Sequence, residues 1–600
     1  MKAAQILALM GIASVSVAQS LPPAPTESIG CVPHDDHWHC EGPAPTNAAV
    51  DSAVASSAAA ATTTTAAAED HDHDHDHDHD HDHDHESHGS EELPWHLQSP
   101  RITLPWSENC LGFHKSFATM FLKLSVHWLL LASTLVSGVA KASCNSIKTY
   151  PVPDGVARKA SYEVKVRSPG GAWHELEIYE TRHQEVNVTT GRTATFTGSL
   201  AYFDFQGRVE VAVSYKAGAI TKARIRPDSF NIVPAVDGDS IAFALDKPKN
   251  LVVHATENVF DVLHLFSNSI VDESAAKNDT NTLYYGPGYH VAKDPIVVES
   301  GKTLYVAGGA VLKASVSFDN QTGAALRGHG ILYKSSSHTI SAWQSKNILI
   351  QDIIVLNPGH YTAQIAESDG VTVSGLRSFS AVQWGDGIDV FSSKNVLIDN
   401  VFLRTSDDSI AIYTHRWDFY GDTQNVTVRD SILWADLAHP INIGTHGNSI
   451  NPETLSGLTF SNLDILDHRE FQMGYQGCIA INPGDSNLVK DVLIEDVRVE
   501  DFRHGQLITM MVMYNQKYNT SPGRGISNVT IRNLDYKGTN AGTAIMTGYN
   551  ETRGIESIKF ENLTINGQGI NDKMAKPGWY LTSDFFPMYV NEHVKNLTFK

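Results

Sequence analysis

Three aspartates are spaced so that they could act together on one bond. Asp386 lies in the segment Trp-Gly-Asp-Gly-Ile-Asp, and the adjacent pair Asp407 and Asp408 follows it by 21 residues. Carboxyl groups that crowd together raise at least one pKa among them, because neighbouring like charges disfavour ionisation. Hydrolysis of an acetal needs one protonated carboxyl as acid for the leaving oxygen and one carboxylate as base for water. We therefore predict that Asp386, Asp407 and Asp408 form a catalytic centre.

Aspartate also has a structural role at turns, where its side chain accepts hydrogen bonds from backbone N–H groups. Asp399, Asp430, Asp491 and Asp496 fit that interpretation. An adjacent pair placed a fixed interval after a third aspartate is different, because such a cluster of charge is costly to bury. Capping alone does not explain the cluster, and this favours the catalytic interpretation.

Three further residues are candidates for substrate binding. His439 stands in Ala-His-Pro-Ile-Asn-Ile-Gly after the aspartate pair, and His446 follows shortly. We expect His439 to contact the substrate or to hydrogen-bond a catalytic carboxylate, and His446 to lie on the same wall. Trp384, two residues before Asp386, either stacks on a sugar ring or packs in the core.

A repeat must position these residues. Segments of about ten residues recur with apolar residues at every second position around a polar corner. One unit cannot bury its own apolar face, whereas stacked units can. We predict an all-β parallel β-helix over residues 274–600, in which rungs lie about 4.8 Å apart and equivalent positions become neighbours. The repeats cover 346–355, 394–403, 424–433, 456–465, 490–499, 527–536 and 556–565.

Residues 150–273 show another pattern, in which short segments of alternating apolar and polar residues are separated by Gly and Pro. Helical periodicity is nearly absent, and this predicts a β-sandwich domain before the β-helix. The domain is either a scaffold that packs against the β-helix or an independent binding module.

The front of the chain carries two segments with the features of secretory signals. Residues 1–18 and 120–142 each combine a lysine, an apolar run and small residues, the second ending in Ala-Lys-Ala. Because two leaders in one chain are unusual, we expect the folded protein to begin near Ser143, with a membrane anchor at 120–142 as the alternative. Residues 19–119 are of low complexity and predict disorder. Their Asp/His tract at 70–85 is either a loose metal-binding segment or a solvated spacer.

Composition excludes some classes of partner and structure. A net charge of −22 counts against nucleic acid, which needs clustered Lys and Arg. Five cysteines, only Cys144 and Cys478 of them in the predicted folded part, exclude a disulfide scaffold. We expect a secreted, extracellular monomeric glycoprotein with no cofactor, no catalytic metal and no stable membrane association. The last repeat, at 593–600, breaks off within a strand and indicates truncation. Sequons occur at Asn187, Asn278, Asn320, Asn425, Asn519, Asn528, Asn550, Asn562 and Asn596.

The acidic residues resemble those of the polygalacturonases, glycoside hydrolase family 28. That family carries N-T-D, D-D, G-H-G and R-I-K on successive rungs of a right-handed parallel β-helix of the pectin-lyase type. Asp386 matches the aspartate of N-T-D, Asp407 and Asp408 match D-D, and His439 matches the histidine of G-H-G. The resemblance implies an inverting hydrolase of polysaccharides such as those of cell walls. In it, Asp407 is the general acid, and Asp386 and Asp408 activate water.

The match ends at the R-I-K rung, which should lie near residues 477–482. That segment, Gly-Cys-Ile-Ala-Ile-Asn, holds no Arg or Lys that could bind a galacturonate carboxylate. The predicted order of sandwich and β-helix is also similar to that of family 49, the dextranases and isopullulanases, so an α-glucan is the alternative substrate. A polysaccharide lyase, which typically needs a basic residue, and a non-catalytic carbohydrate-binding β-helix are the remaining alternatives.

Overall fold

The computed structural model describes residues 145–600, apart from 188 and 473, and four short strands upstream. Of these four, β1 (Ser28–Ile29) pairs with β4 (Gly42–Pro43) and β2 (Val32–His34) pairs with β3 (His37–His39), both antiparallel. The predicted leaders at 1–18 and 120–142, the Asp/His tract and the rest of 19–119 lie outside the described residues.

Two sheets fill the region that precedes the β-helix. Their facing sides share one apolar core, to which Val164, Val211 and Ile241 contribute from one sheet and Leu251 and Leu265 from the other. Alternation explains the first sheet, because every second residue of β6 is buried. In order, that sheet contains β12 (Ala235–Asp237), β13 (Ser240–Leu245), β10 (Val209–Tyr215), β6 (Tyr162–Arg167) and β7 (His174–Leu176).

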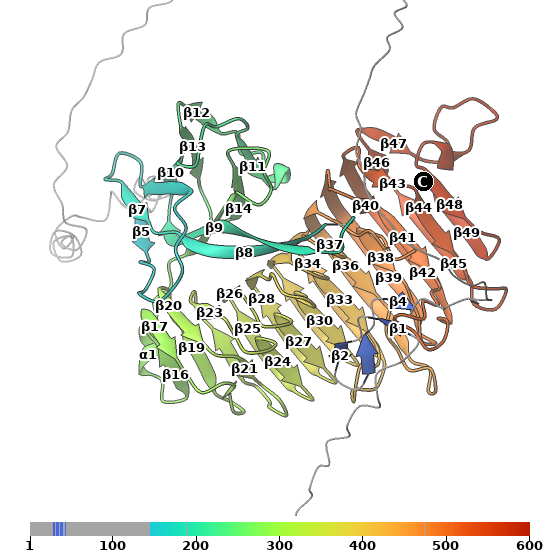
Figure 1. The fold of residues 1–600 in the computed structure, drawn as a ribbon, viewed down its shortest axis with the longest axis horizontal. Helices are drawn as coiled ribbons and strands as arrows, with labels where there is room; N and C mark the ends of the chain where they lie inside the picture. The colour runs from blue at the N-terminus through green and yellow to red at the C-terminus, as the bar shows by residue number, and fades with distance from the viewer. Residues whose placement is uncertain are drawn as a thin grey trace, which may run out of the picture. The chain divides into compact units, whose positions relative to one another are not determined.

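The second sheet is built around a long ribbon, visible in Figure 1, that β8 and β9 form. Its strands pair antiparallel except for β15 and β9, which run parallel. A 3-10 turn, η1 (Asp228–Phe230), follows β11. In order, the sheet contains β11 (Arg224–Arg226), β14 (Asn250–His254), β15 (Leu263–Ser269), β9 (Thr193–Gln206) and β5 (Ser146–Thr149), with β8 (Tyr179–Val186) paired to β9.

After the short helix α1 (Ser274–Asn278) the chain coils into parallel rungs, each with up to three short strands. The all-β parallel β-helix predicted from the repeat is confirmed. An 11-stranded sheet forms the face that concerns the site, here called face one. It contains β18 (Ile296–Val297), β21 (Val316–Ser317), β24 (Ile340–Trp343), β27 (Ala363–Ala366), β30 (Ile388–Phe391), β33 (Ile410–Tyr413), β36 (Ile441–Ile443), β38 (Ile479–Ile481), β41 (Ile508–Met511), β44 (Ala544–Thr547) and β48 (Met588–Val590).

The other two faces join at a corner into one 21-stranded sheet. Face two contains β16 (Thr282–Tyr285), β19 (Thr303–Val306), β22 (Ala325–Arg327), β25 (Lys346–Gln351), β28 (Asp369–Ser374), β31 (Lys394–Asp399), β34 (Thr423–Arg429), β45 (Ile555–Glu561) and β49 (Val594–Phe599). Face three contains β17 (Gly288–Val291), β20 (Ala310–Lys313), β23 (Ile331–Tyr333), β26 (Ile354–Leu356), β29 (Arg377–Phe379), β32 (Phe402–Thr405), β35 (Ile432–Ala435), β46 (Leu563–Ile565) and β47 (Gln568–Ile570). The strands β37 (Thr454–Asp467), β39 (Leu488–Glu500) and β42 (Gly525–Lys537) run through both. The short strands β40 (Gly505–Gln506) and β43 (Ala541–Gly542) pair outside the faces, and η2 (Thr582–Asp584) precedes β48.

Asn and Asp residues turn the chain between faces two and three and stack from rung to rung. Asp430, Asp491 and Asp496 have φ between 52° and 57°, a left-handed conformation that Asn and Asp tolerate better than most residues. The amides of Asn462 and Asn528 on following rungs donate to Asp430 and Asp491 at 2.5 and 2.7 Å. The role of these aspartates is therefore structural, although the donors to Asp430 and Asp491 are side-chain amides and not the expected backbone N–H groups. Asp399, for which the same role was expected, lies in β31 and accepts from Arg429 at 2.9 Å.

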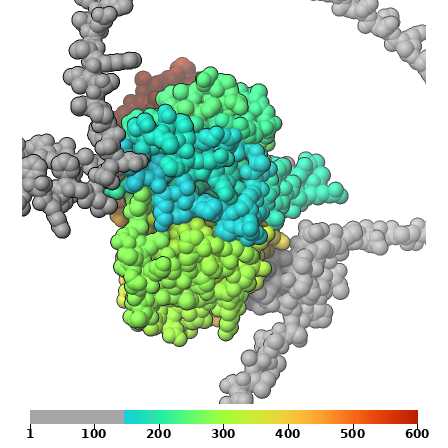
Figure 2. Space-filling model, turned by 90° about the vertical axis from the view of Figure 1, so that its left-hand side faces the viewer, coloured from blue at the N-terminus to red at the C-terminus, as the bar shows by residue number. Residues whose placement is uncertain are grey.

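The N-terminal sheets pack on face three. Outward side chains of face three, among them Phe379, Phe402 and Trp434, share a buried cluster with Tyr202 and Phe266 of the second sheet. Figure 2 faces the first rungs and shows their end filled with side chains rather than open. Among the described helices, none is long and apolar enough to cross a membrane.

Candidate active site

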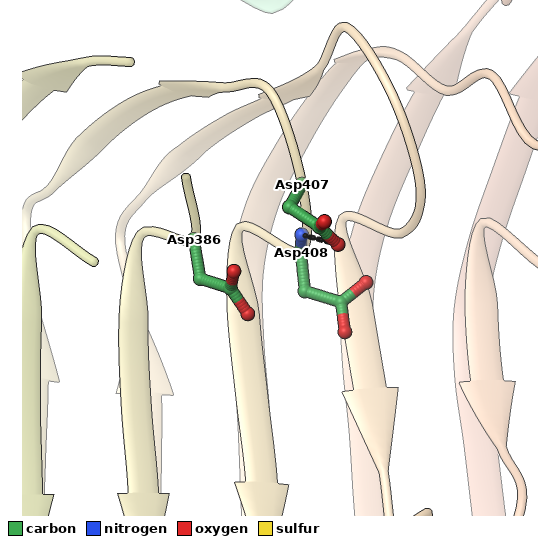
Figure 3. A group of neighbouring side chains, drawn as sticks. All are labelled: Asp386, Asp407 and Asp408. Carbon is green, nitrogen blue, oxygen red and sulfur yellow. Dashed lines mark hydrogen bonds between the residues drawn. The ribbon is translucent and has the colours of Figure 1, made fainter. Parts of the chain in front are cut away.

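The three aspartates of the cluster lie in turns that lead into face one. Asp386 precedes β30, and Asp407 and Asp408 precede β33 on the next rung. The backbone N–H of Gly387 donates to the carbonyl of Asp408 at 2.8 Å, so the two turns lie directly side by side. One carboxylate oxygen from each aspartate lies within 4.8 Å of the other two. Figure 3 shows all three side chains pointing to the same side of the wall.

Burial and mutual repulsion shift the protonation of the cluster. Asp386 is 5% exposed, and burial followed by repulsion from its acidic neighbours raises its pKa well above the ordinary value. Asp407 is the more open of the two residues, being partly exposed. Its pKa is also raised well above the ordinary value, first by burial and then by the charge of Asp408. Both shifts favour the protonated forms of Asp386 and Asp407.

Both carboxylate oxygens of Asp408 accept hydrogen bonds from neighbouring residues. One oxygen accepts hydrogen bonds from the backbone N–H and Nδ1 of His439 at 3.1 and 2.6 Å. The other accepts from Nδ2 of Asn442 at 2.7 Å and from the hydroxyl of Tyr413 at 3.3 Å. Four donors fix the orientation of this carboxylate. Asp407 and Asp408 are thus adjacent residues in opposite environments.

His439 is fully buried, so the structure places it behind the carboxylates rather than on an exposed surface. Its Nε2 lies 2.5 Å from the carbonyl oxygen of Tyr475. Burial lowers the pKa of the imidazole, but the charge and hydrogen bond of Asp408 outweigh burial and raise it to about 9. Both ring nitrogens of the resulting imidazolium donate. Of the two roles predicted for His439, the geometry supports the hydrogen bond to a carboxylate.

A fourth carboxyl group lies beside the triad. Asp389 points outward from β30 but is only 2% exposed, and one of its oxygens has no hydrogen-bond partner among the described residues. Burial and the charge of Asp408 raise its pKa well above the ordinary value. The sequence had placed this aspartate in the segment with Asp386 without marking it as part of the site.

Cations reach the carboxylates from loops, and not from the rung at 477–482, where the sequence shows none. On the rung where R-I-K was expected, Ala480 and Asn482 carry no charge. Instead Arg416, in the loop after β33, lowers the pKa of Asp386, and Lys517, in the loop after β41, interacts electrostatically with Asp407. Their loops are insertions outside the repeat, so no periodic signal marked them.

The two remaining predicted site residues border the same region. The guanidinium of Arg416 lies 3.4 Å from Nδ1 of His446, whose ring contacts Tyr413 edge-on at 5.0 Å between centroids. Trp384 is partly exposed and has a left-handed backbone with φ of 55°, which forms the tight turn before Asp386. Sequence reasoning did not single out Tyr413, Asn442 or Tyr475, because their roles arise only when rungs stack.

The three aspartates are also the one group of described His, Cys, Asp and Glu residues close enough to hold a metal ion. Acid and base chemistry on an acetal does not require one. The expectation of a metal-free centre remains a prediction.

Comparisons with known proteins bear on this geometry. Residues 248–510 match the family model of glycosyl hydrolases family 28. The polygalacturonase of Juniperus ashei is 26% identical over 230 residues, which cover 36% of this chain and 41% of that protein. The endo-polygalacturonase of Pectobacterium carotovorum subsp. carotovorum is 24% identical over 184 residues, 30% of this chain and 39% of that protein. Among solved structures, Dex49A from Penicillium minioluteum superposes with a TM-score of 0.54 at 13% identity, over 76% of this chain and 96% of that one.

The chain is similar in sequence to glycoside hydrolase family 28, and it shares the β-helix fold of the glycoside hydrolase clan of families 28 and 49. The two similarities differ in kind. The match to family 28 is a match of sequence, whereas the likeness to Dex49A is a likeness of fold. The chain spans about two fifths of the length of the two curated relatives named above. A second family model, the histidine triad hairpin domain, matches residues 21–42, the region of β1 to β4.

Proposed function

We propose that this protein hydrolyses glycosidic bonds of a polysaccharide through an aspartate triad. The observation that carries the proposal is the contrast between adjacent residues. Asp407 is partly exposed with a raised pKa, whereas Asp408 is locked by four hydrogen-bond donors. Two neighbouring carboxyl groups whose environments push their protonation apart are the usual signature of an acid and base pair.

In this mechanism Asp407 donates its proton to the leaving glycosidic oxygen. Asp408, together with Asp386 on the neighbouring rung, accepts the proton of the attacking water. The His439 imidazolium is held through both of its ring nitrogens, by Asp408 and by the carbonyl of Tyr475. It thereby fixes the carboxylate of Asp408. A positive ring behind the base also limits the repulsion between Asp408 and the other acids.

We further propose inversion at the anomeric carbon. The nearest oxygens of the triad lie within 4.8 Å, closer than the roughly 6.5–9.5 Å typical of a two-carboxylate inverting pair. A third carboxylate removes the need for that gap, because water can lie between Asp386 and Asp408 while Asp407 serves the leaving group. Proton NMR of the first product tests this, and a product of retained configuration would contradict it.

Two substrate classes remain, and a specific observation favours each. Arg416 and Lys517 beside the carboxylates favour an acidic polymer such as polygalacturonate, since cations bind carboxylates. The uncharged Ala480 and Asn482 favour a neutral α-glucan. The same cations also keep the polysaccharide lyase as an alternative, because a lyase needs a basic residue to remove a sugar C–H proton.

Reducing ends released from polygalacturonate, dextran and pullulan by the full chain test the proposal. We expect release from at least one polymer across the acidic and neutral range, without unsaturated sugar. An unsaturated product, seen by its ultraviolet absorbance, would replace the hydrolase with a lyase. No release from any of the three would contradict the proposed function.

We also propose that the protein is secreted as a monomeric glycoprotein. Asn187 and Asn278 are exposed and suit glycan attachment, whereas Asn519 is buried and its Nδ2 donates to the carbonyl of Thr445 at 2.6 Å. Mass spectrometry after secretion from a eukaryotic host should find glycans at the first two sites and none at Asn519. Gel filtration at working concentration should give the mass of one chain.

A further inference from the structure

Three exposed tyrosines lie at the C-terminal end of face one. Tyr514 follows β41, Tyr549 follows β44, and Tyr589 is in β48; they are 42%, 45% and 59% exposed. The rings of Tyr514 and Tyr549 meet edge to face at 6.5 Å between centroids. Exposed aromatic residues grouped on adjacent elements indicate a binding surface.

The strand register connects this group to the candidate active site. Asn442, which donates to Asp408, is aligned with Ala480, then Thr509, then Ile545, and then Tyr589 on successive strands of face one. Four steps at the spacing of neighbouring strands place Tyr589 roughly 19 Å from Asn442. The register therefore places Tyr589 on the face that the turns of the triad lead into, several rungs along the solenoid axis, while Tyr514 and Tyr549 directly follow strands of that face.

A single loop joins the two regions. The loop after β41 carries Tyr514 and then Lys517 and Tyr518, both of which donate to Oε1 of Gln472 at 2.8 and 2.7 Å. The ring of Tyr518 also stacks on Tyr475 at 4.8 Å. Because the carbonyl of Tyr475 is the partner of His439, this loop borders the triad at one end and presents Tyr514 at the other.

We propose that Tyr514, Tyr549 and Tyr589 form a second carbohydrate-binding surface for the polysaccharide chain whose bond the triad cleaves. This inference rests on the proposed function and deepens it, because it assigns a long polymer as the substrate. An aromatic ring packs its face against the C–H groups of a pyranose ring, while a tyrosine hydroxyl remains free to hydrogen-bond the sugar hydroxyls. The position of the surface along face one suits units distant from the scissile bond.

Affinity electrophoresis of full-length protein in native gels tests the inference apart from catalysis. The gels contain polygalacturonate, dextran or pullulan, and all variants carry Asp407→Asn so that the polymer stays intact. We expect at least one polymer to retard the Asp407→Asn protein. Adding Tyr514→Ala with Tyr549→Ala, or Tyr589→Ala alone, should weaken the affinity about tenfold. The matched control is Trp173→Ala, which removes an equally exposed aromatic residue from the N-terminal sheets and should leave retardation unchanged.

Equal retardation of the tyrosine variants and their parent would overturn the inference, as would no retardation by any polymer. Gel filtration adds a further outcome. If the parent is a dimer and the tyrosine variants are monomers, the surface binds a second copy of the chain and the inference fails. Retardation that depends on the tyrosines, in a protein that cleaves none of the three polymers, would uphold the surface and reject the proposed function. Cleavage of a polymer, together with retardation that does not depend on the tyrosines, would uphold the proposed function and reject the surface.

Discussion

At the scale of single residues, the pairing of His439 with Asp408 decides what the cluster can do. Nδ1 of the imidazolium lies 2.6 Å from a carboxylate oxygen of Asp408, and the Tyr475 carbonyl holds the ring from behind. The proposed base is therefore fixed in place with a cation beside it. Asp407 receives no hydrogen bond from His439, and burial and the charge of Asp408 raise its pKa. One histidine thus contributes to the chemical difference between the two aspartates, together with Asn442 and Tyr413.

A stability measurement checks the charge on His439. Its pKa rises from 6.5 to about 9 in the folded protein, so the pair contributes fully below pH 6.5 and is lost as pH rises through 9. The free energy of unfolding should fall by at most about 3 kcal/mol over that window. His439→Gln should remove this fall, which urea unfolding at several pH values measures. A fall of the same size in the variant would contradict an ionised His439.

Metal removal is a second test at this scale. Because Asp407 and Asp408 supply acid and base themselves, we expect hydrolysis to survive dialysis against a chelator. The measurement is the rate of reducing-end release before dialysis, after it, and after addition of calcium. A rate that disappears and returns with calcium would mean that the three carboxylates hold an ion instead of acting as acid and base.

The sequence predicted these residues unevenly, for a physical reason. Asp386, Asp407 and Asp408 could be predicted because a rung of 21 residues brings aspartates together whatever the loops do. The contact of His439 with Tyr475 could not be predicted, because Tyr475 arrives from an irregular turn. Arg416 and Lys517 were missed for the same reason, and their absence from the expected rung was misleading about charge near the site.

At the scale of elements, buried ion pairs hold the turns that carry the site. Arg404, three residues before Asp407, donates to both oxygens of Asp436 at 2.8 and 3.1 Å, and Asp436 stands three residues before His439. Arg503 donates to the same carboxylate at 3.0 Å. The N-terminal region closes this network, since the carbonyl of Val259 accepts from Arg404 at 2.9 Å. Adjacent catalytic turns are therefore anchored to each other beneath the site.

Removing one partner of that network should be costly. Arg404→Met leaves Asp436 buried with less compensation, and we expect a loss of about 3–5 kcal/mol in the free energy of unfolding. The matched control is Arg429→Met, which breaks the surface pair with Asp399 and should cost at most about 1 kcal/mol. Urea unfolding measures both. Equal losses in the two variants would show that the buried network does not anchor the turns.

The strands themselves were predictable, because the alternation of apolar residues within each repeat matches the side chains that fill the β-helix interior. The buried pairs on face three were not. In the sequence, nothing distinguishes Arg404 and Asp436 from solvated polar residues. They are buried because the N-terminal sheets cover face three, and one sequence does not reveal which outward face is covered.

At the scale of the whole molecule, the N-terminal sheets and the β-helix share apolar surface. Phe379, Phe402 and Trp434 point away from the interior of the β-helix and are fully buried with residues of the second sheet. Each such side chain contributes about 1.5–3 kcal/mol on burial. The sequence left open whether the N-terminal domain is a scaffold or a binding module. Its buried contact with face three favours the scaffold.

Expression of residues 274–600 alone tests this dependence. We expect the fragment to bind a hydrophobic dye such as anilinonaphthalene sulfonate, or to aggregate, because face three loses its cover. Residues 143–600 are the control and should remain dispersed with little dye fluorescence. A fragment that behaves like the control would show that the β-helix does not need the N-terminal sheets.

The central claim is that Asp407 is the proton donor of a hydrolytic triad, and the most direct measurement compares two single substitutions. Asp407→Asn should lower kcat for reducing-end release about 10³-fold while the unfolding transition stays in place. Asp430→Asn, on the exposed corner between faces two and three where the side chain accepts from Asn462, should leave kcat unchanged. Full turnover by the Asp407→Asn protein would contradict the account.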